Sequence, residues 1–436
     1  MCKPDAYLGV VSEAIAYNHG RLMSTVSPSG APAERSGPLH GVRVLELGSF
    51  IAGPFAGQLL ADYGAEVIKV EPVGAGDPMR RWGIVHGGEG LWWPSIARNK
   101  RSVSIDLRDE RGRELVRALA SHCDIVIENF RPGRLSDWGL DYAELSARNP
   151  RIVMVHVSGY GQTGPRASAA GFGSIGEAVG GIRHTTGERG RRSVRTGISL
   201  GDSLAAMFSV IGALAALAEA RVSGAGQEVD VAIYESVAAL MESSMADFAV
   251  AGVRRERTGA VLPGVAPSNA YPTADCAEVI IAANADSVFA RLCNAMGRDD
   301  LVKDPRFTTH EARGEHMAEL DELVGAWTST TTAESLLEVL DAHGVPADRI
   351  FTVEDMLTDP QYLAREMVLD AVDQAGRSLP ITGIVPKFSR TPGEVRWLGP
   401  ALGEDTADVL TSLAGCGASE LAALAEASVI GGPDLA

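Results

Sequence analysis

Short apolar runs alternate with longer amphipathic segments along the first part of the chain. Runs rich in β-branched residues predict strands at 41–47, 66–71, 101–107, 124–129 and 151–159. Helical spacing of apolar residues predicts helices at 52–64 and 110–122. Strands that alternate with helices pair in parallel through crossover connections. The pattern therefore predicts an α/β fold with a Rossmann-like large domain.

The later pattern predicts a second, smaller α/β domain. The apolar run 203–217 predicts a buried helix and is short for a membrane span. The Gly/Pro-rich stretch 257–272 predicts a hinge loop, and strand and helix patterns follow it. We expect four segments. A flexible extension at 1–38 precedes the first part of the large domain at 39–245. A linker loop and the small domain follow at 246–370, and the chain returns to the large domain with a C-terminal tail at 371–436.

Composition and charge exclude several functions. The 436 residues carry a formal net charge of −17, which disfavours nucleic acid and anionic membranes as partners. The five cysteines and nine histidines show no zinc-type spacing, so no metal is expected. The turn "LGSFIAGP" lacks the G-x-G-x-x-G pattern of dinucleotide binders. No signal peptide is visible at the start, and we expect a cytoplasmic protein.

Asp202 stands at the head of the apolar run 203–217. An aspartate in this place is a good helix N-cap. The positive end of a helix also stabilises an ionised carboxylate, which is the form that a nucleophile requires. Position alone leaves both roles open.

Several blocks of sequence resemble the class III CoA-transferase family, which includes formyl-CoA transferase and crotonobetainyl carnitine CoA-transferase. They begin with "GVRVLELGSFIAGPFAGQLLADYGAEVIKVEPVGAGDPMR" and continue with "ARNKRSVSIDLRDERGRELVRALASHCDIVIENFRPG", "NPRIVMVHVSGYGQTGP", "SLGDS" and "GVPADRIFTVEDMLTDPQYLAREMV". The resemblance extends from about residue 39 to residue 425.

The resemblance implies an activity and an assembly. CoA would move from an acyl-CoA thioester to a free carboxylic acid through an aspartyl anhydride and an aspartyl–CoA thioester. Asp202 matches the aspartate of that chemistry. The thioester is a substrate, and no permanently bound cofactor is implied. The family also implies a homodimer whose two chains interlock like rings.

The resemblance and the phosphates of CoA together suggest a CoA site in residues 39–245. Arg108 takes a position that is basic in formyl-CoA transferase, and Asn129 and Phe130 match its CoA-contacting segment. Cations near phosphates are expected, although each one alone also fits a solvated surface charge. The predicted CoA-binding residues are Lys100, Arg101, Ile105, Asp106, Leu107, Arg108, Asn129, Phe130, Arg131 and Arg134.

The predicted acyl pocket departs from the family at two places. Ile51 replaces a glutamine of formyl-CoA transferase, which favours a bulkier or more apolar acyl group. Gly173 holds a position that is acidic in the family, and Glu177 either substitutes for that acid or is a surface residue. Backbone N–H groups at Ala52 and Gly53 are candidates for stabilising an oxyanion.

The Gly-rich loop near 258–267 is either a plain linker or a lid, with Gly259 and Gly264 as its flexible points.

Two other functions remain open. The same fold hosts α-methylacyl-CoA racemases, which use a histidine where this chain has Gly171–Gly173 and a glutamate where it has Ala285. Both differences favour transfer over racemisation. A CoA-binding protein without catalysis is the other alternative, and the retained Asp202 argues against it.

Overall fold

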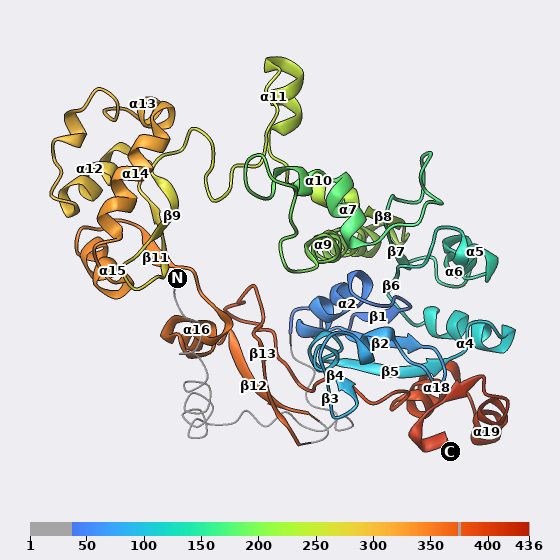
Figure 1. The fold of residues 1–436 in the computed structure, drawn as a ribbon. Helices are drawn as coiled ribbons and strands as arrows, with labels where there is room; N and C mark the ends of the chain where they lie inside the picture. The colour runs from blue at the N-terminus through green and yellow to red at the C-terminus, as the bar shows by residue number, and fades with distance from the viewer. Residues whose placement is uncertain (1–36, 374–375, 436) are drawn as a thin grey trace. The chain divides into compact units, whose positions relative to one another are not determined.

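The computed structural model describes residues 37–373 and 376–435, and these residues form two compact units (Figure 1). The described part of the large unit consists of residues 37–183, 195–254 and 364–435. The small unit consists of residues 184–194 and 255–363 in the described chain. The sequence analysis placed the linker and small domain at 246–370 as one segment.

A seven-stranded sheet forms the centre of the large unit, in the order β14-β5-β2-β1-β6-β7-β8. Every neighbouring pair is parallel except β14 with β5. Its strands are β1 (Arg43–Glu46), β2 (Glu66–Glu71), β5 (Lys100–Ile105), β6 (Ile125–Glu128), β7 (Val153–Ser158), β8 (Glu228–Ala232) and β14 (Ile430–Gly431). The predicted α/β class, with its parallel central sheet, is confirmed.

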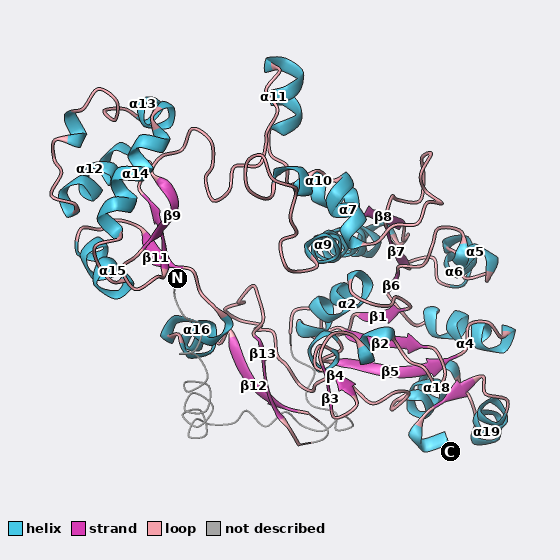
Figure 2. Ribbon diagram, in the orientation of Figure 1, coloured by secondary structure: helices cyan, strands magenta, loops and turns pink. Residues whose placement is uncertain are grey.

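Helices cover both faces of this sheet (Figure 2). One face packs against α2 (Ala52–Asp62) and α9 (Leu200–Ser223) in a core rich in alanine and valine. The other face packs against α4 (Glu110–Ala120), α18 (Thr406–Ala414) and α19 (Ala418–Glu426). Parallel strands covered on both sides read as nearly continuous apolar runs, which is why the sequence pattern located them.

The chain changes direction across the sheet at β1. It runs from β1 to β2 on one side, and later places β6 against the other side of β1. In open α/β sheets, ligands bind in the crevice beside the carboxyl ends of the strands at such a switch point. The loops after β1 and β6 therefore mark the edge where a site is expected.

Shorter elements complete the large unit. They are η2 (Pro78–Arg81), β3 (Val85–His86), β4 (Glu89–Gly90), α3 (Trp93–Ile96), α5 (Arg134–Asp137), α6 (Tyr142–Arg148), α7 (Gly173–Val179), α10 (Ile233–Ala238), α11 (Ser244–Ala251), β12 (Val368–Val372), β13 (Ser378–Thr382) and η4 (Pro433–Leu435). Helix α8 (Ile182–Thr185) lies where the chain passes from the large unit to the small one.

The small unit has its own antiparallel sheet and core. Its strands β9 (Ser268–Pro272), β10 (Glu278–Ala282) and β11 (Ala347–Arg349) pair in the order β11-β10-β9. The helices around them and after them are α12 (Asp286–Ala295), η3 (Leu301–Lys303), α13 (His310–Glu315), α14 (Met317–Thr328), α15 (Ala333–Ala342), α16 (Val353–Thr358) and α17 (Pro360–Ala364).

The predicted hinge loop 257–272 extends too far, and its predicted end is wrong. Residues 268–272 form β9, because Tyr271 is buried and its hydroxyl donates a 2.5 Å hydrogen bond to Asp321.

Helix α9 is longer than the predicted segment 203–217. It begins at Leu200 and ends at Ser223, where Gly224 takes the left-handed conformation that commonly follows a helix. Within the described chain, α9 is long and apolar enough to cross a membrane by length and composition alone. A core helix meets the same criterion, and here Ala205, Ala206 and Ala213 are buried against the sheet.

Candidate active site

Asp202 lies in the first turn of α9, at the third helical position. The N-cap is Ser199, so the prediction that Asp202 caps the helix is wrong. The helix begins earlier than expected because the Ser203 N–H already donates a 3.0 Å hydrogen bond to the Ser199 carbonyl. An acidic residue at this position still faces the positive end of the helix.

The Asp202 carboxylate is half-buried and has no hydrogen-bond donor among the residues that the structure describes. Burial and, to a smaller extent, the negative charge of Glu177 raise its pKa to about 6, with Arg195 opposing the shift. We expected the helix terminus to favour the anion, but burial and Glu177 outweigh that effect. The group is still ionised by about ten to one at pH 7. A carboxyl group shifted in this way by burial and a charged neighbour is typical of functional sites.

Gly173 provides the space that the Asp202 carboxylate occupies. A methyl group added to Gly173 would overlap Asp202 Oδ2 and lie 2.6 Å from Asp202 Cγ. The same methyl group at Gly201 would lie 2.9 Å from the Gly173 carbonyl oxygen, so α7 and α9 meet here through two glycines. An acidic side chain at 173 is therefore incompatible with this conformation of Asp202.

Glu177 is buried, with 1% of its surface exposed, and the surface interpretation of this residue is wrong. Its carboxylate accepts a 2.9 Å hydrogen bond from Arg183 Nε and a longer one of 3.4 Å from the backbone N–H of Gly201. A buried carboxylate needs such partners, since an unpaired charge in the interior is costly. Glu177 therefore binds the first turn of α9 directly beside Asp202.

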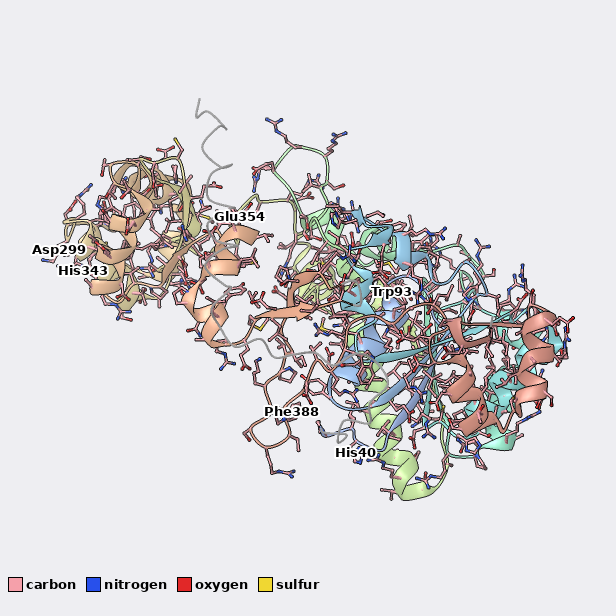
Figure 3. The ribbon with its side chains drawn as sticks, turned by 90° about the horizontal axis from the view of Figure 1, so that it is seen from below. His40, Trp93, Asp299, His343, Glu354 and Phe388 are labelled. Carbon is pink, nitrogen blue, oxygen red and sulfur yellow. The ribbon has the colours of Figure 1, made fainter. Side chains whose placement is uncertain are left out.

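The predicted pocket residues at the start of α2 share an edge and a face of the sheet with Asp202. Helix α2 follows the carboxyl end of β1, and α9 precedes the parallel strand β8, so both helices begin at the carboxyl edge. They pack against each other on the same face. Ile51 is buried in one cluster with Met79 and Trp93, and Figure 3 labels Trp93. Ala52 and Gly53 form the first turn of α2.

Asn129 connects the two loops at the switch point. Its side chain accepts a 2.8 Å hydrogen bond from the Ser49 N–H and donates one of 2.8 Å to the Ser49 carbonyl. Both polar groups of this predicted CoA-binding residue are thus used to hold the turn after β1. Phe130 packs edge-on against Trp138, with ring centroids 5.3 Å apart.

Buried charges hold the rest of this turn. Lys69 Nζ donates a 2.9 Å hydrogen bond to the Gly48 carbonyl, and Lys100 Nζ donates one of 2.6 Å to the Pro54 carbonyl. Asp77 Oδ1 accepts a 3.2 Å hydrogen bond from the Phe50 N–H. The sequence analysis missed Lys69 and Asp77. A lysine within the apolar strand "EVIKVE" was the available signal, since a lysine on a buried strand requires a buried partner.

Lys100 and Arg101, which we predicted to bind CoA, belong to a basic run at 98–101 whose charges are already paired inside the fold. Lys100 is fully buried and pairs with Glu46 at 2.8 Å, and Arg98 is buried against Asp62 at 2.6 Å. Arg101 is mostly buried and pairs with Glu66, Asp405 and Asp408. The cause is the partner acids, which lie on β1, α2, β2 and the C-terminal segment and which the local sequence does not reveal.

Three of the predicted CoA-binding cations are exposed. Arg108 follows β5, is 85% exposed and pairs with Asp106 at 2.8 Å. Arg131 and Arg134 follow β6, and Arg134 lies 4.0 Å from Asp137. Because β2 and β1 lie between β5 and β6, the two strands that these arginines follow are about 14 Å apart across the sheet. The neighbouring Ile105 is buried, and Leu107 packs against the same core.

Gly259 and Gly264, the predicted lid glycines, both lie in the small unit and have positive φ angles of 68° and 77°. The Gly259 N–H donates a 3.0 Å hydrogen bond to the Gly187 carbonyl. The Gly264 backbone lies close against Gly314 of α13. The lid role stays a prediction.

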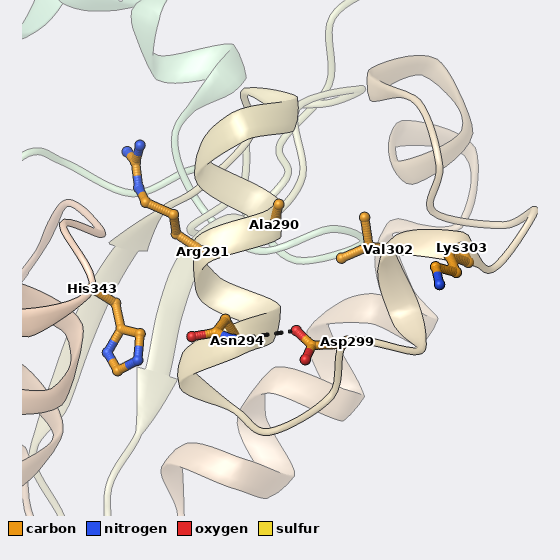
Figure 4. Close-up of a pocket in the computed structure, with 7 residues that line it drawn as sticks. All are labelled: Ala290, Arg291, Asn294, Asp299, Val302, Lys303 and His343. Atoms are coloured by element: carbon orange, nitrogen blue, oxygen red, sulfur yellow. Dashed lines mark hydrogen bonds between the residues drawn. The ribbon is translucent and has the colours of Figure 1, made fainter.

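A surface depression of about 420 Å³ lies in the small unit and contains none of the predicted site residues (Figure 4). It is lined by Ala290, Arg291, Asn294, Asp299, Val302, Lys303 and His343. The described residues contain no group of histidine, cysteine or acidic side chains arranged to hold a metal ion.

Comparison with known proteins gives a consistent result. Residues 39–406 match CoA-transferase family III. The chain is 55% identical to the succinyl-CoA–D-citramalate CoA-transferase of Chloroflexus aurantiacus, over 90% of this chain and 98% of that protein. It is 36% identical to the succinate–glutarate CoA-transferase of Agrobacterium fabrum, over 87% of this chain and 96% of that protein. A crystal structure of a CAIB/BAIF family protein from Brucella suis matches with a TM-score of 0.77 and 36% identity, covering 87% and 100% of the two chains.

Asp202→Asn should stabilise the protein at neutral pH. A folded-state pKa near 6 means that folding disfavours the charged form, and this cost is absent below pH 4 and complete above about pH 7. The amide has no such cost. We expect a melting temperature about 1–3 °C above wild type at pH 7.5, with a difference that shrinks toward pH 4.5. Calorimetry across this range is the measurement, and a pH-independent difference would contradict the burial effect.

Proposed function

The chain belongs to CoA-transferase family III, and from this premise we propose that it transfers CoA from succinyl-CoA to a short dicarboxylic acid through covalent intermediates on Asp202. That the protein is a CoA-transferase follows from the family match and the identity to named CoA-transferases. The observation that supports the role of Asp202 is a half-buried carboxylate without a hydrogen-bond donor in the described chain. Such a group costs stability and is free to react.

The names of the relatives support the proposed substrates. One is named for succinyl-CoA and D-citramalate, and another for succinate and glutarate. Both names pair succinate with a second dicarboxylic acid of five carbons. Since 55% identity extends over almost the whole of the first relative, we propose a citramalate-like hydroxy-dicarboxylate as the acceptor.

The proposed chemistry proceeds in four steps, with no net uptake or release of a proton. An Asp202 oxygen attacks the thioester carbon, the C–S bond breaks, and an acyl–aspartyl anhydride and CoA thiolate form. The thiolate attacks Asp202 Cγ, which releases succinate and leaves an aspartyl–CoA thioester. The acceptor carboxylate attacks that thioester, which forms a second anhydride and releases the thiolate. The thiolate finally attacks the acceptor acyl carbon and frees Asp202. Covalent capture divides one difficult exchange into easier steps.

The electrostatics of Asp202 suit both halves of this cycle. Its raised pKa makes the carboxylate a better nucleophile than an ordinary aspartate, yet it is ionised above pH 7. Each step also develops an oxyanion that needs donors. The first N–H groups of α2, at Ala52 and Gly53, lie on the same edge and face and are the proposed donors.

The CoA nucleotide is proposed to bind along the carboxyl edge, where Arg108, Arg131 and Arg134 are exposed. Lys100 and Arg101 would act indirectly, because their charges are already paired inside the fold. The interlocked homodimer and the cytoplasmic location rest on the family resemblance and on sequence composition, and they stay predictions.

Asp202→Asn should lower kcat by at least about 1000-fold, because an amide cannot form the anhydride. The wild-type protein, incubated with succinyl-CoA and quenched with hydroxylamine, should carry the modification on the peptide that contains Asp202. Peptide mass spectrometry is the measurement, with the Asp202→Asn protein as its control. Turnover near wild type in that variant, without deamidation, would place the chemistry elsewhere.

Gly173→Ala should lower kcat by about 10- to 100-fold, because the added methyl group displaces the Asp202 carboxylate from its position. The atoms that must move belong to a short side chain, so the melting temperature should stay close to wild type. Steady-state kinetics with a melting curve test this. A wild-type kcat in Gly173→Ala would show that the observed conformation of Asp202 is not required.

Arg108→Glu and Arg134→Glu should each raise KM for succinyl-CoA by about 10-fold, because charge reversal opposes the CoA phosphates. Arg298→Glu is the matched control, since Arg298 is an exposed arginine of the small unit that also pairs with an aspartate two residues away. Equal KM values in all three variants would remove this placement of CoA.

A further inference from the structure

The charged groups around Asp202 leave one positive charge available to a substrate. On α7, Glu177 pairs with Arg183 at 2.9 Å, so these two charges neutralise each other. In the segment before α9, Arg195 acts on Asp202 electrostatically and forms no ion pair with a described residue. A dicarboxylic acyl group brings a second negative charge to this acidic neighbourhood. That charge needs a cation, and among the described groups that act on Asp202 the cation is Arg195, which has no ion-pair partner in the described chain.

The position of Arg195 is fixed by the first turn of α9. Its Nη2 atom lies 3.3 Å from Ser199 Oγ, and Ser199 is the N-cap. Ser199 is the N-cap and Asp202 is the third helical residue, so both belong to the beginning of α9. Ser199 Oγ makes no capping bond to the helix and accepts from the guanidinium instead. The Arg195 guanidinium is exposed to solvent, is hydrogen-bonded at the N-cap, and acts electrostatically on the Asp202 carboxylate in the same turn.

We propose that Arg195 binds the distal carboxylate of the dicarboxylic acyl group while its other end reacts with Asp202, so that it selects dicarboxylic over monocarboxylic substrates. This inference rests on the proposed function. The two end carbons of a succinyl group are about 4 Å apart when extended, from three C–C bonds of about 1.5 Å. A nucleophile approaches the acyl carbon at about 3–3.5 Å. The Arg195 guanidinium is hydrogen-bonded to Ser199, three residues before Asp202, so we expect it to reach a distal carboxylate.

One arginine would serve both donor and acceptor. In the proposed cycle both acids pass through an anhydride on the same Asp202 carbon, Cγ, so their distal carboxylates occupy the same region. An arginine binds a carboxylate through two parallel N–H donors, which orients the acid as well as attracting it. Selection of both substrates as dicarboxylates then follows from one residue.

The test compares two exchange reactions in the full-length protein. CoA exchange is measured between succinyl-CoA and labelled succinate, and between butyryl-CoA and labelled butyrate, which has the same chain length without the distal carboxylate. The positive charge of Arg195 lowers the pKa of Asp202, so removing Arg195 raises that pKa. Assays therefore run at pH 8.5, where Asp202 is ionised in every variant. The variants are Arg195→Met and Arg195→Lys. Arg221→Met is the matched control, since Arg221 is an exposed arginine in the last turn of the same helix.

We expect Arg195→Met to lower kcat/KM for succinyl exchange by about 10- to 100-fold, the usual effect of losing a charged hydrogen bond. Butyryl exchange should change less than about 3-fold, and Arg195→Lys should restore part of the succinyl rate. Equal losses for both substrates, or none, would overturn the inference, as would a wild-type protein that exchanges butyryl as well as succinyl groups. If wild type exchanges neither and forms no Asp202 adduct, the proposed function itself fails.

Discussion

The site depends on a carboxylate that is partly removed from water and receives no hydrogen bond from any residue in the described part of the chain. Asp202 occupies the first turn of α9, but Glu177 accepts from the neighbouring Gly201 N–H. Gly173 gives the carboxylate space and offers no polar side chain to it. The fold thus provides room where a stabilising partner would be expected. Leaving this carboxylate without hydrogen bonds lowers the stability of the fold. It also favours nucleophilic attack, because a fully hydrogen-bonded carboxylate is a weaker nucleophile.

A second set of buried charges holds the turn after β1, at the same carboxyl edge of the sheet. Glu46 lies between Lys69 and Lys100, with contacts of 2.9 and 2.8 Å, and Asp77 pairs with Lys69 at 2.7 Å. Burial lowers the pKa of Lys100, although Glu46 opposes this, whereas two acid partners outweigh burial at Lys69 and raise its pKa. Buried ion pairs add little net stability. Here the lysines and Asp77 also bind the backbone of the turn after β1, which favours a role in positioning. The buried Glu46 also explains why residue 57 is a glycine, since a side chain there would overlap the Glu46 carboxylate.

The sequence predicted the strands and the α/β class, because periodicity and local propensity determine them. The reactive role of Asp202 came from the family resemblance and stays a prediction. The sequence analysis misplaced the start of α9, since the backbone forms a turn before the apolar run begins. It also took Glu177 and the run 98–101 for surface residues. Their burial depends on acids and glycines from distant segments, which a single sequence does not pair. The sequence contained one signal that Glu177 is buried. The glycines at 173, 176 and 180 have the spacing of one helix face, and a helix with such a face packs closely against its neighbour.

The absence of an acid at position 173 has a physical explanation that is compatible with activity. An acidic side chain there would displace the Asp202 carboxylate, so the two acids cannot coexist in this geometry. Glu177 supplies a negative charge one helical turn away, but Arg183 balances it at 2.9 Å. Asp202 therefore has an acidic neighbour that raises its pKa and does not occupy the space where a substrate would approach. A protein that only binds CoA gains nothing from a half-buried, unbonded carboxylate, since asparagine or alanine would remove its cost. The persistence of that cost in the fold favours the reactive interpretation of Asp202 over binding alone.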